Sequence, residues 1–465
     1  MKRAGTLFMA IRVPRIYYGW WIVVTAVTAT TAYAFATLCL PVFYPEFVNT
    51  FGWNRASIAG GGSLRLLLGS AMAPINGVLI DRYGTKAVLI AGALGTGMSL
   101  ALFSSVNSLW QYYLLCVLLG ISVSGIYLLP NHLVVASWFA KNRGLPISLV
   151  SLGTGLGGAV IPLLATYLIL TFHWRGAFLA LAIVMAIPLL MIIFLIQEKQ
   201  PVDLSVDSLS MMGAGKAPNP EPPVHNSTTS THQIVTNPAF WMFCAAAMLM
   251  AAAMFGPREH MVLFLRSLNY SPAVSAAVLS SIFVVSLFGR FISGPLSDKF
   301  SARRVIVVNF LLCGLSLTLL QSGSDFLLLY LFPILFGLNY GAIINLTPLV
   351  VFESFGVRKV GKAYGLAAGC FLFGSAGGPF LIGRIFDQTH SYRLPFLADL
   401  ALGFIAMIAI LAFAWKRGVS GLTLEQARNG LEPELRRGMP SDSPSLAHPG
   451  QLKTPARLRP GSQEE

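Results

Sequence analysis

A few ionisable side chains lie inside otherwise apolar stretches of the chain. They are Arg65, the consecutive residues Arg258, Glu259 and His260, and Arg290. An ionised side chain at the centre of a bilayer costs about 2.5–3.5 kcal/mol on insertion scales. Each of these residues is therefore a candidate for binding an ion or for pairing with a neighbouring helix.

Arg290 is the strongest candidate for an anion site. It lies eight residues before the loop residue Asp298, which places it about 12 Å from the membrane surface and close to the midplane. Ser286 and Phe283 lie one and two helical turns earlier on the same face. Because a guanidinium can hold a carboxylate through two parallel hydrogen bonds, we predict that all three contact a bound anion. The alternative is a structural arginine paired with another helix.

Arg65 precedes the loop residue Asp81 by sixteen residues. At 1.5 Å per residue this is about 24 Å from that surface, within reach of the opposite interface. Arg65 would there either attract anions to the outer mouth or simply extend its side chain to water. Both interpretations remain open.

The run Pro257-Arg258-Glu259-His260 also allows two interpretations. Adjacent helical residues point about 100° apart, so at most two of the three ionisable residues can face one cavity together. Glu259 or His260 could titrate as a proton-coupling group, with Arg258 beside it. We favour the simpler interpretation of a helix that bends at proline and contains an internal Arg–Glu pair.

Two tyrosines and an asparagine complete the predicted pocket. A row of residues follows helical spacing along one face of the stretch 109–137: Gly120, Ser124, Tyr127 and Asn131. Tyr340 lies in a later stretch, and a tyrosine offers a ring for an alkyl group and a hydroxyl for a carboxylate. We expect Tyr127, Asn131 and Tyr340 to contact the anion, with packing alone as the alternative. His132 and Asp399 are not predicted site residues.

Membrane-spanning helices must position these side chains. The composition is 55% apolar and only 11% charged, and the mean hydropathy is +0.69. Apolar stretches near twenty residues long can cross about 30 Å of hydrocarbon as helices, which pair every backbone amide internally. We predict an all-α membrane protein with twelve spans: 19–42, 56–79, 86–104, 109–137, 145–169, 174–196, 239–265, 272–295, 304–322, 326–351, 361–384 and 393–415.

The chain contains an internal repeat with an offset of 217 residues. The offset superposes glycines, prolines and a loop aspartate: Gly77 on Gly294, Asp81 on Asp298, Gly120 on Gly337, Gly144 on Gly361, Gly157 on Gly374 and Pro162 on Pro379. We therefore predict two pseudo-symmetric six-helix bundles, 19–196 and 237–416. The segment 1–18, the polar linker 197–236 and the mostly disordered tail 417–465 complete the chain, with a short helix expected near 423–431.

Basic residues gather in the loops on the side of the N-terminus. The positive-inside rule therefore predicts cytoplasmic termini in a plasma membrane, or in the inner membrane of a bacterium. The net charge of +14 is mostly this asymmetry, and basic residues in the tail add to it. Topology and anionic lipid headgroups explain such a charge, so we expect no nucleic-acid partner. The five cysteines lie within predicted spans and are expected to pack as small apolar residues.

Two related loops follow the second and eighth spans: Gly77-x-x-x-Asp81-Arg82-Tyr-Gly84-Thr-Lys86 and Gly294-x-x-x-Asp298-Lys299-Phe-Ser-Ala-Arg303. The glycines would admit close helix approach, and the aspartates would cap a helix or hold a neighbour's positive end. We predict that these residues join helices at a cytoplasmic gate.

The two loops resemble the loop signature of the major facilitator superfamily. Four further motifs resemble the monocarboxylate transporter and oxalate/formate antiporter group: Tyr18-Gly19-Trp20-Trp21, Trp138-Phe139-x-x-x-Arg143-Gly144, Phe288-Gly289-Arg290 and Tyr340-Gly341. The resemblance implies alternating access around a central cavity lined by spans 1, 4, 7 and 10. It also implies a substrate role for Arg290, which matches an arginine of that group.

The chain departs from this group at two places. Ser286 replaces the aspartate that vertebrate monocarboxylate carriers have before the arginine, and 367–378 lacks the lysine of oxalate carriers. One central positive charge suits a monoanion, so we expect a secondary active carrier for lactate-like or pyruvate-like anions, with proton symport. The alternatives are an organic anion exchanger, an exporter of amphipathic compounds or, from another class, a non-transporting membrane sensor.

Enzyme chemistry is not expected. The sequence lacks a His-Glu-x-x-His zinc motif, a Gly-x-Ser-x-Gly nucleophile elbow and a Walker-type phosphate loop. We therefore predict no catalytic residue, no metal and no cofactor, and a monomer whose partners are the anion, a proton and membrane lipid.

Overall fold

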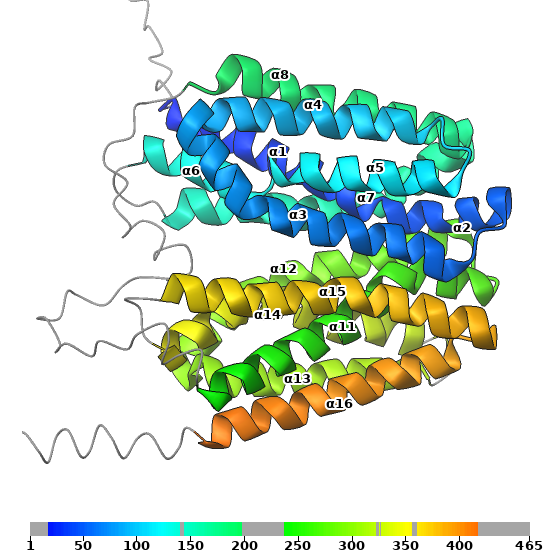
Figure 1. Ribbon diagram of the computed structural model, residues 1–465, viewed down its shortest axis with the longest axis vertical. Coiled ribbons are helices and arrows are strands. Elements are labelled where there is room, and N and C mark those ends of the chain that lie inside the picture. The colour runs from blue at the N-terminus through cyan, green and yellow to red at the C-terminus, as the bar shows by residue number, and fades with distance from the viewer. Residues whose placement is uncertain are drawn as a thin grey trace, which may run out of the picture. The chain divides into compact units, whose positions relative to one another are not determined.

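The computed structural model describes residues 17–139, 144–197, 237–321, 325, 327–355 and 360–416. Every regular element within these ranges is helical, which confirms the predicted fold class (Figure 1). The tail with its expected helix at 423–431, and nearly all of the predicted linker and of the segment 1–18, lie outside the described residues. So does Arg143 of the Trp138 motif.

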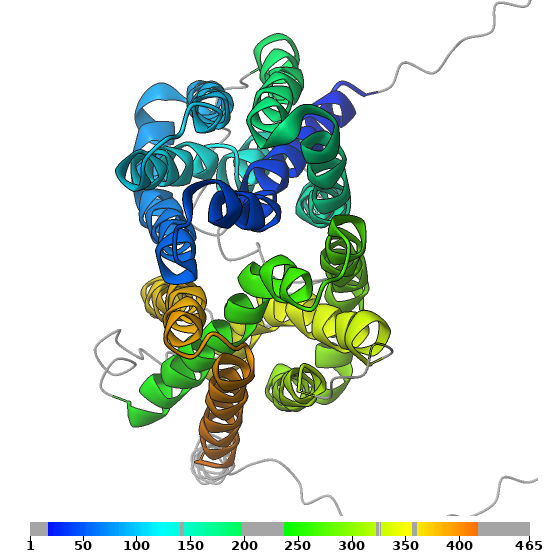
Figure 2. The same cartoon turned by 90° about the vertical axis from the view of Figure 1, so that its right-hand side faces the viewer.

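The described part of the first repeat contains eight helical elements: α1 (Gly19–Leu38), α2 (Leu40–Phe51), α3 (Arg55–Tyr83), α4 (Thr85–Phe103), α5 (Leu109–Ser124), α6 (Leu128–Trp138), α7 (Gly144–Val184) and α8 (Ala186–Leu195). That of the second contains seven: α11 (Pro238–Ser267), α12 (Pro272–Phe300), α13 (Ala302–Leu319), η2 (Leu327–Leu331), α14 (Phe332–Phe355), α15 (Val360–Thr389) and α16 (Arg393–Lys416). We call these sets the N-half and the C-half. Figure 2 shows them as two groups of helices, coloured blue to teal and green to orange.

Eleven of the described helical stretches are long and apolar enough to cross a membrane. One of them, Leu145–Leu195, is 51 residues long. Within it, His173 has φ 57° and ψ 167°, values that no α-helix contains. The chain therefore turns back at His173, and this stretch supplies the two predicted spans 145–169 and 174–196.

Several helices extend beyond the spans expected from hydropathy. The first expected span ends at residue 42, but α2 continues to Phe51. The second, expected at 56–79, is α3, whose 29 residues measure about 43 Å. Its start is fixed by Asn54, whose side chain accepts a hydrogen bond from the Ser57 amide at 2.8 Å. Such lengths exceed the hydrocarbon thickness, so the helices project beyond it.

The fourth span, expected as one helix over 109–137, is broken between α5 and α6. Pro130 has no amide hydrogen to donate to the Ile126 carbonyl, as a continuous helix would require. The Asn131 side chain replaces this donor: Nδ2 donates to the Ile126 oxygen at 2.9 Å and to the Tyr127 oxygen at 2.7 Å. The predicted polar face is thus interrupted, and its members lie on two helices and the break: Gly120, Ser124, Tyr127 and Asn131.

Two seams and a smaller contact between α2 and α11 join the N-half to the C-half. In one seam α3 packs against α15, and in the other α7 packs against α12. Within the halves, α1 packs against α7 and α11 against α15. The α1–α7 contact needs a glycine, because a Cβ atom on Gly157 would lie 2.7 Å from the Thr31 carbonyl oxygen. Buried polar residues lie where the two halves pack against each other.

We call the two ends of the helical body the terminal face and the far face. The terminal face contains the start of α1 and the turns at Gly84 and Ser301. The far face contains the turns 52–54, 104–108, 268–271 and 390–392.

Candidate functional site

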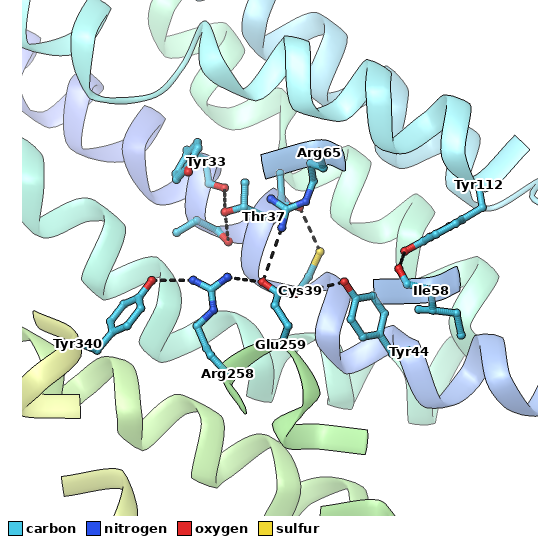
Figure 3. A network of polar contacts seen from close by, with 12 residues as sticks. Tyr33, Thr37, Cys39, Tyr44, Ile58, Arg65, Tyr112, Arg258, Glu259 and Tyr340 are labelled. Atoms are coloured by element: carbon cyan, nitrogen blue, oxygen red, sulfur yellow. Dashed lines mark hydrogen bonds and ion pairs between the residues drawn. The ribbon is translucent and has the colours of Figure 1, made fainter. Parts of the chain in front are cut away.

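A cluster of buried polar side chains lies where the two halves meet (Figure 3). Its three charged members are only 1–3% exposed: Arg65, Arg258 and Glu259. Arg65 comes from α3 in the N-half, and the other two are consecutive on α11 in the C-half. Tyr44 from α2 and Tyr340 from α14 complete the cluster.

Glu259 lies at the centre of this cluster. Its carboxylate pairs directly with the Arg258 guanidinium, and its Oε1 lies 3.9 Å from Nη2 of Arg65. The Tyr44 hydroxyl donates to Glu259 Oε2 at 3.2 Å. On the other side, Arg258 Nη1 donates to the Tyr340 hydroxyl at 2.6 Å. Glu259 on α11 therefore links the C-half to two consecutive helices of the N-half, α2 and α3.

Neighbouring residues fix the positions of these side chains. The Arg258 guanidinium carbon lies 4.3 Å from the centre of the Phe255 ring, which restrains it by a cation–π contact. Phe255 and Phe283 both pack beside Tyr340, with ring centres 5.8 and 5.7 Å away. Gly62 on α3 leaves room for the Tyr44 hydroxyl, which a side chain at that position would displace.

The cluster carries an excess of positive charge, because two guanidinium groups share one carboxylate. Within the described part of the chain, three of their buried nitrogen atoms have no hydrogen-bond partner: Arg65 Nε, Arg65 Nη2 and Arg258 Nε. Buried unpaired N–H groups are costly, and a carboxylate is their preferred acceptor. The arrangement is suited to binding a small monoanion.

Arg65 is buried, not at the outer interface as the sequence suggested. It lies ten residues after the start of α3, about 15 Å from the far-face end of that helix. Its exposure of 2% excludes extension of the side chain to water. The count along the sequence placed Arg65 too near the interface because it started from one loop and took the hydrocarbon as the whole length of the helix. The alternative in which the side chain extends to water is excluded, whereas the role in attracting an anion stays a prediction.

His260 faces away from this cluster. Its Nδ1 lies 3.2 Å from the Tyr392 hydroxyl, and its Nε2 lies 2.9 Å from the Pro379 carbonyl oxygen on α15. Of the predicted run, only Arg258 and Glu259 enter the cluster, and they form the internal Arg–Glu pair that the sequence favoured.

Arg290 lies in the seam between α12 and α7. Its Nη1 donates to the Thr154 hydroxyl at 2.8 Å and to the Ser151 carbonyl at 3.2 Å, both in the N-half. The Ser286 hydroxyl donates to the Phe283 carbonyl of its own helix at 2.7 Å. Among these predicted neighbours, only Phe283 also contacts the cluster, through the Tyr340 ring.

Tyr127 and Asn131, which were predicted for the pocket, and His132 and Asp399, which were not, each have different neighbours. Tyr127 stacks on Tyr33 of α1 with ring centres 4.2 Å apart and is 37% exposed. Asn131 stabilises the break before α6, as described above. His132 Nε2 lies 3.2 Å from the Ser151 hydroxyl. Asp399 is 2% exposed and its Oδ2 has no hydrogen-bond partner among the described residues.

The predicted gate loops lie at the terminal face. A Cβ atom on Gly77 or on Gly294 would meet no atom within 4 Å in the described structure, so the expected close helix approach at these glycines is absent. Asp81 and Asp298 are exposed. Among the residues that the structure describes, the joining contact predicted for these four is therefore not formed in this conformation.

The basic residues of these loops contact helix ends. Lys86 Nζ donates to the Ile193 carbonyl at 2.8 Å, and Arg82 lies 5.2 Å from the Tyr83 ring centre. Gly84 has φ 85°, a left-handed conformation that glycine adopts without strain.

In the second loop, Glu353 supplies the cap that Asp298 was expected to make. Its Oε2 accepts from the Ala302 amide at 2.8 Å, and its Oε1 lies 3.4 Å from Arg303 Nε. The negative carboxylate at the start of α13 is stabilised by the helix dipole.

Sequence reasoning missed Tyr44 and Phe255. Tyr44 lies just beyond the expected span 19–42, but it belongs to the apolar run 40–51 that continues as α2. Phe255 precedes Arg258 by three residues, a spacing that places two side chains on one helical face. Both signals were present in the sequence.

Comparisons with known proteins match most of the chain. The model of the Major Facilitator Superfamily matches residues 25–285 and 260–444. Monocarboxylate transporter 13 of Bos taurus is 25% identical over 82% of this chain and 86% of its own length. Monocarboxylate transporter 12 of Mus musculus is 24% identical, with 84% and 86% covered.

Two solved structures share the fold. The nucleoside transporter NupG superposes with a TM-score of 0.68 at 14% identity, over 85% of this chain and 99% of that one. A bacterial homolog of the human lysosomal transporter Spinster, in an inward-facing and occupied conformation, gives 0.67 at 17% identity, with 85% and 97% covered. At these identities the likeness concerns the fold alone.

Proposed function

Because the chain belongs to the major facilitator superfamily, whose members are membrane transporters and not enzymes, we propose that it carries small monocarboxylate anions by alternating access. The observation that supports this substrate class is the cluster of Arg65, Arg258 and Glu259, in which two buried guanidinium groups share one carboxylate. Relatives named monocarboxylate transporters, at 24–25% identity, support the same class.

A substrate carboxylate would bind between Arg65 and Arg258. It would supply acceptors for the guanidinium nitrogens that lack partners in the cluster. While Glu259 is ionised, one added negative charge would balance the excess guanidinium. The aromatic rings of Tyr340 and Phe283 would then contact a short alkyl group.

We propose that Glu259 couples transport to protons. Its carboxylate holds the place beside both arginines that the substrate needs. A proton on Glu259 would neutralise it and release the guanidinium groups for the anion, so proton and anion would move together. The charged and titratable groups that contact Glu259 are Arg65, Arg258 and Tyr44, whereas His260 faces α15.

Arg290 is proposed as a second anion contact on the route from the terminal face. Its Nε is buried without a hydrogen-bond partner among the described residues. Its bonds to Thr154 and Ser151 join the halves and would have to open when α7 and α12 separate. We propose that the anion then takes the place of these acceptors.

The arrangement in the cell is part of the same proposal. The terminal face would be cytoplasmic, with the segment 1–18, the linker 197–236 and the tail 417–465 on that side of the plasma membrane. The bundles 19–196 and 237–416 would rock against each other within one monomer.

The test is uptake of radiolabelled lactate and pyruvate by proteoliposomes, with and without an inward proton gradient. We expect wild-type uptake to rise with the gradient and the Arg258→Gln variant to be inactive. Arg175→Gln is the matched control, because Arg175 bonds Ser104 and Asn107 within the N-half at the far face. Absence of uptake of any short monocarboxylate would refute the substrate class. Uptake that requires internal anion and ignores the gradient would identify an exchanger.

A further inference from the structure

A carboxylate from the C-half caps a helix of the N-half at the far face. Asp387, near the end of α15, accepts hydrogen bonds from the first amides of α3: Oδ1 from the Arg55 amide at 3.0 Å and Oδ2 from the Ala56 amide at 2.8 Å. The start of a helix has unpaired N–H groups and a partial positive charge, so a carboxylate is stabilised there. The contact therefore holds the two halves together by charge and by hydrogen bonds.

The Arg55 side chain strengthens this contact from the other side. Its guanidinium carbon lies 3.6 Å from the Phe386 ring centre and 4.9 Å from that of Tyr392, both in the C-half. The backbones also touch, because a Cβ atom on Gly383 would lie 2.7 Å from the Ala56 Cα. We call Asp387, Arg55, Ala56 and Gly383 the far-face clasp.

The clasp has no counterpart at the equivalent positions of the internal repeat. At the offset of 217 residues, Asp387 corresponds to Leu170 and Gly383 to Thr166. Leu170 is 65% exposed, so the equivalent position on α7 makes no comparable contact. The clasp belongs to one seam only, which points to a role other than building the bundle.

The clasp and the buried cluster share the same helices. Arg55 and Arg65 are both on α3, and Glu259 is on α11, which packs against the α15 helix that carries Asp387. His260, next to Glu259, contacts the Tyr392 hydroxyl, and the Arg55 guanidinium lies over the Tyr392 ring. A movement of α3 away from α15 at the far face would therefore also move Arg65 away from Glu259.

We propose that the far-face clasp is the outer gate of the transport cycle: it opens to admit the anion from the far face, and its closure brings Arg65 to Glu259. This inference rests on the proposed function for the identity of the anion. The gate itself is independent of which anion is carried. Loss of one charge–helix contact should raise the ratio of open to closed far face about tenfold.

Spin-label distances across the far face test the gate without any substrate. Labels would be placed at Ser105→Cys in the N-half and Ser267→Cys in the C-half, both exposed, in full-length protein lacking its natural cysteines. We expect Asp387→Asn to shift the distance distribution toward longer values. The matched control is Asp325→Asn, because Asp325 bonds Tyr270 within the C-half at the same face and should leave the distribution unchanged.

A second variant tests the backbone contact separately. Gly383→Ala keeps Asp387 but places a methyl group against the Ala56 backbone, so it should open the far face in the same direction. If neither Asp387→Asn nor Gly383→Ala lengthens the distances, the clasp is not a gate. Because no ligand is present, this result would not depend on the outcome of the uptake experiment.

Discussion

The substitution Arg65→Gln separates anion binding from folding. It removes one of the two guanidinium groups beside Glu259 but leaves that carboxylate paired with Arg258 and bonded by Tyr44. No buried charge is left without a partner, so the fold should be retained. The charge of the cluster falls by one unit, which weakens its attraction for an anion.

The magnitude follows from the contact that a bound carboxylate would lose. Two unit charges 4 Å apart interact by about 4 kcal/mol at an effective dielectric constant of 20, and removal of one member of a buried pair typically costs about 2–5 kcal/mol. Taking about 2–4 kcal/mol, the dissociation constant of the anion should rise about 30- to 700-fold.

Calorimetric titration of the purified protein with pyruvate and lactate would measure this loss. The melting temperature of Arg65→Gln should stay at or above the wild-type value, because two like charges no longer face each other. Arg175→Gln, at the far-face surface, should bind as the wild type does. Unchanged affinity in Arg65→Gln would show that the substrate does not use the excess charge of the cluster.

Two further predictions concern coupling and stability. In Glu259→Gln the side chain at the centre of the cluster can no longer exchange a proton. Uptake in proteoliposomes should therefore lose its response to an imposed pH gradient, whereas counterflow of labelled anion should persist. A full response to the gradient in this variant would exclude Glu259 as the coupling group. Asn131→Ala removes both hydrogen bonds at the break before α6 and leaves the Ile126 carbonyl without its donor. The free energy of unfolding should therefore fall by about 1–3 kcal/mol. An unchanged melting temperature would contradict this account of the break.

Hydropathy and the internal repeat were sufficient to predict the all-helical fold, because apolar length and repeated glycines are local properties of the sequence. The break between α5 and α6 was not predicted, because 109–137 was expected as one span, although Pro130 removes a backbone donor there. The cluster was predicted only in part. Arg65, Arg258, Glu259 and Tyr340 were all named, but the contact between Glu259 and Arg65 depends on how the halves pack, with α3 against α15 and α2 against α11.

Arg290 illustrates the same limit. Its depth was estimated from one helix, but its hydrogen-bond partners Thr154 and Ser151 lie on α7, 136 and 139 residues away in sequence. Spacing along one helix gives the height of a side chain in the membrane and says little about which neighbouring helix it faces. Distant pairs of this kind need the tertiary structure.

The position of Glu259 has a kinetic consequence for the proposed cycle. A carboxylate fixed beside two guanidinium groups acts as a tethered competitor that is always present at high local concentration. A substrate carboxylate must displace it, so the hydrogen bonds that the substrate forms with the arginines are offset by those that Glu259 loses. Binding is then an exchange of nearly equivalent partners, with modest affinity and rapid release on either side of the membrane.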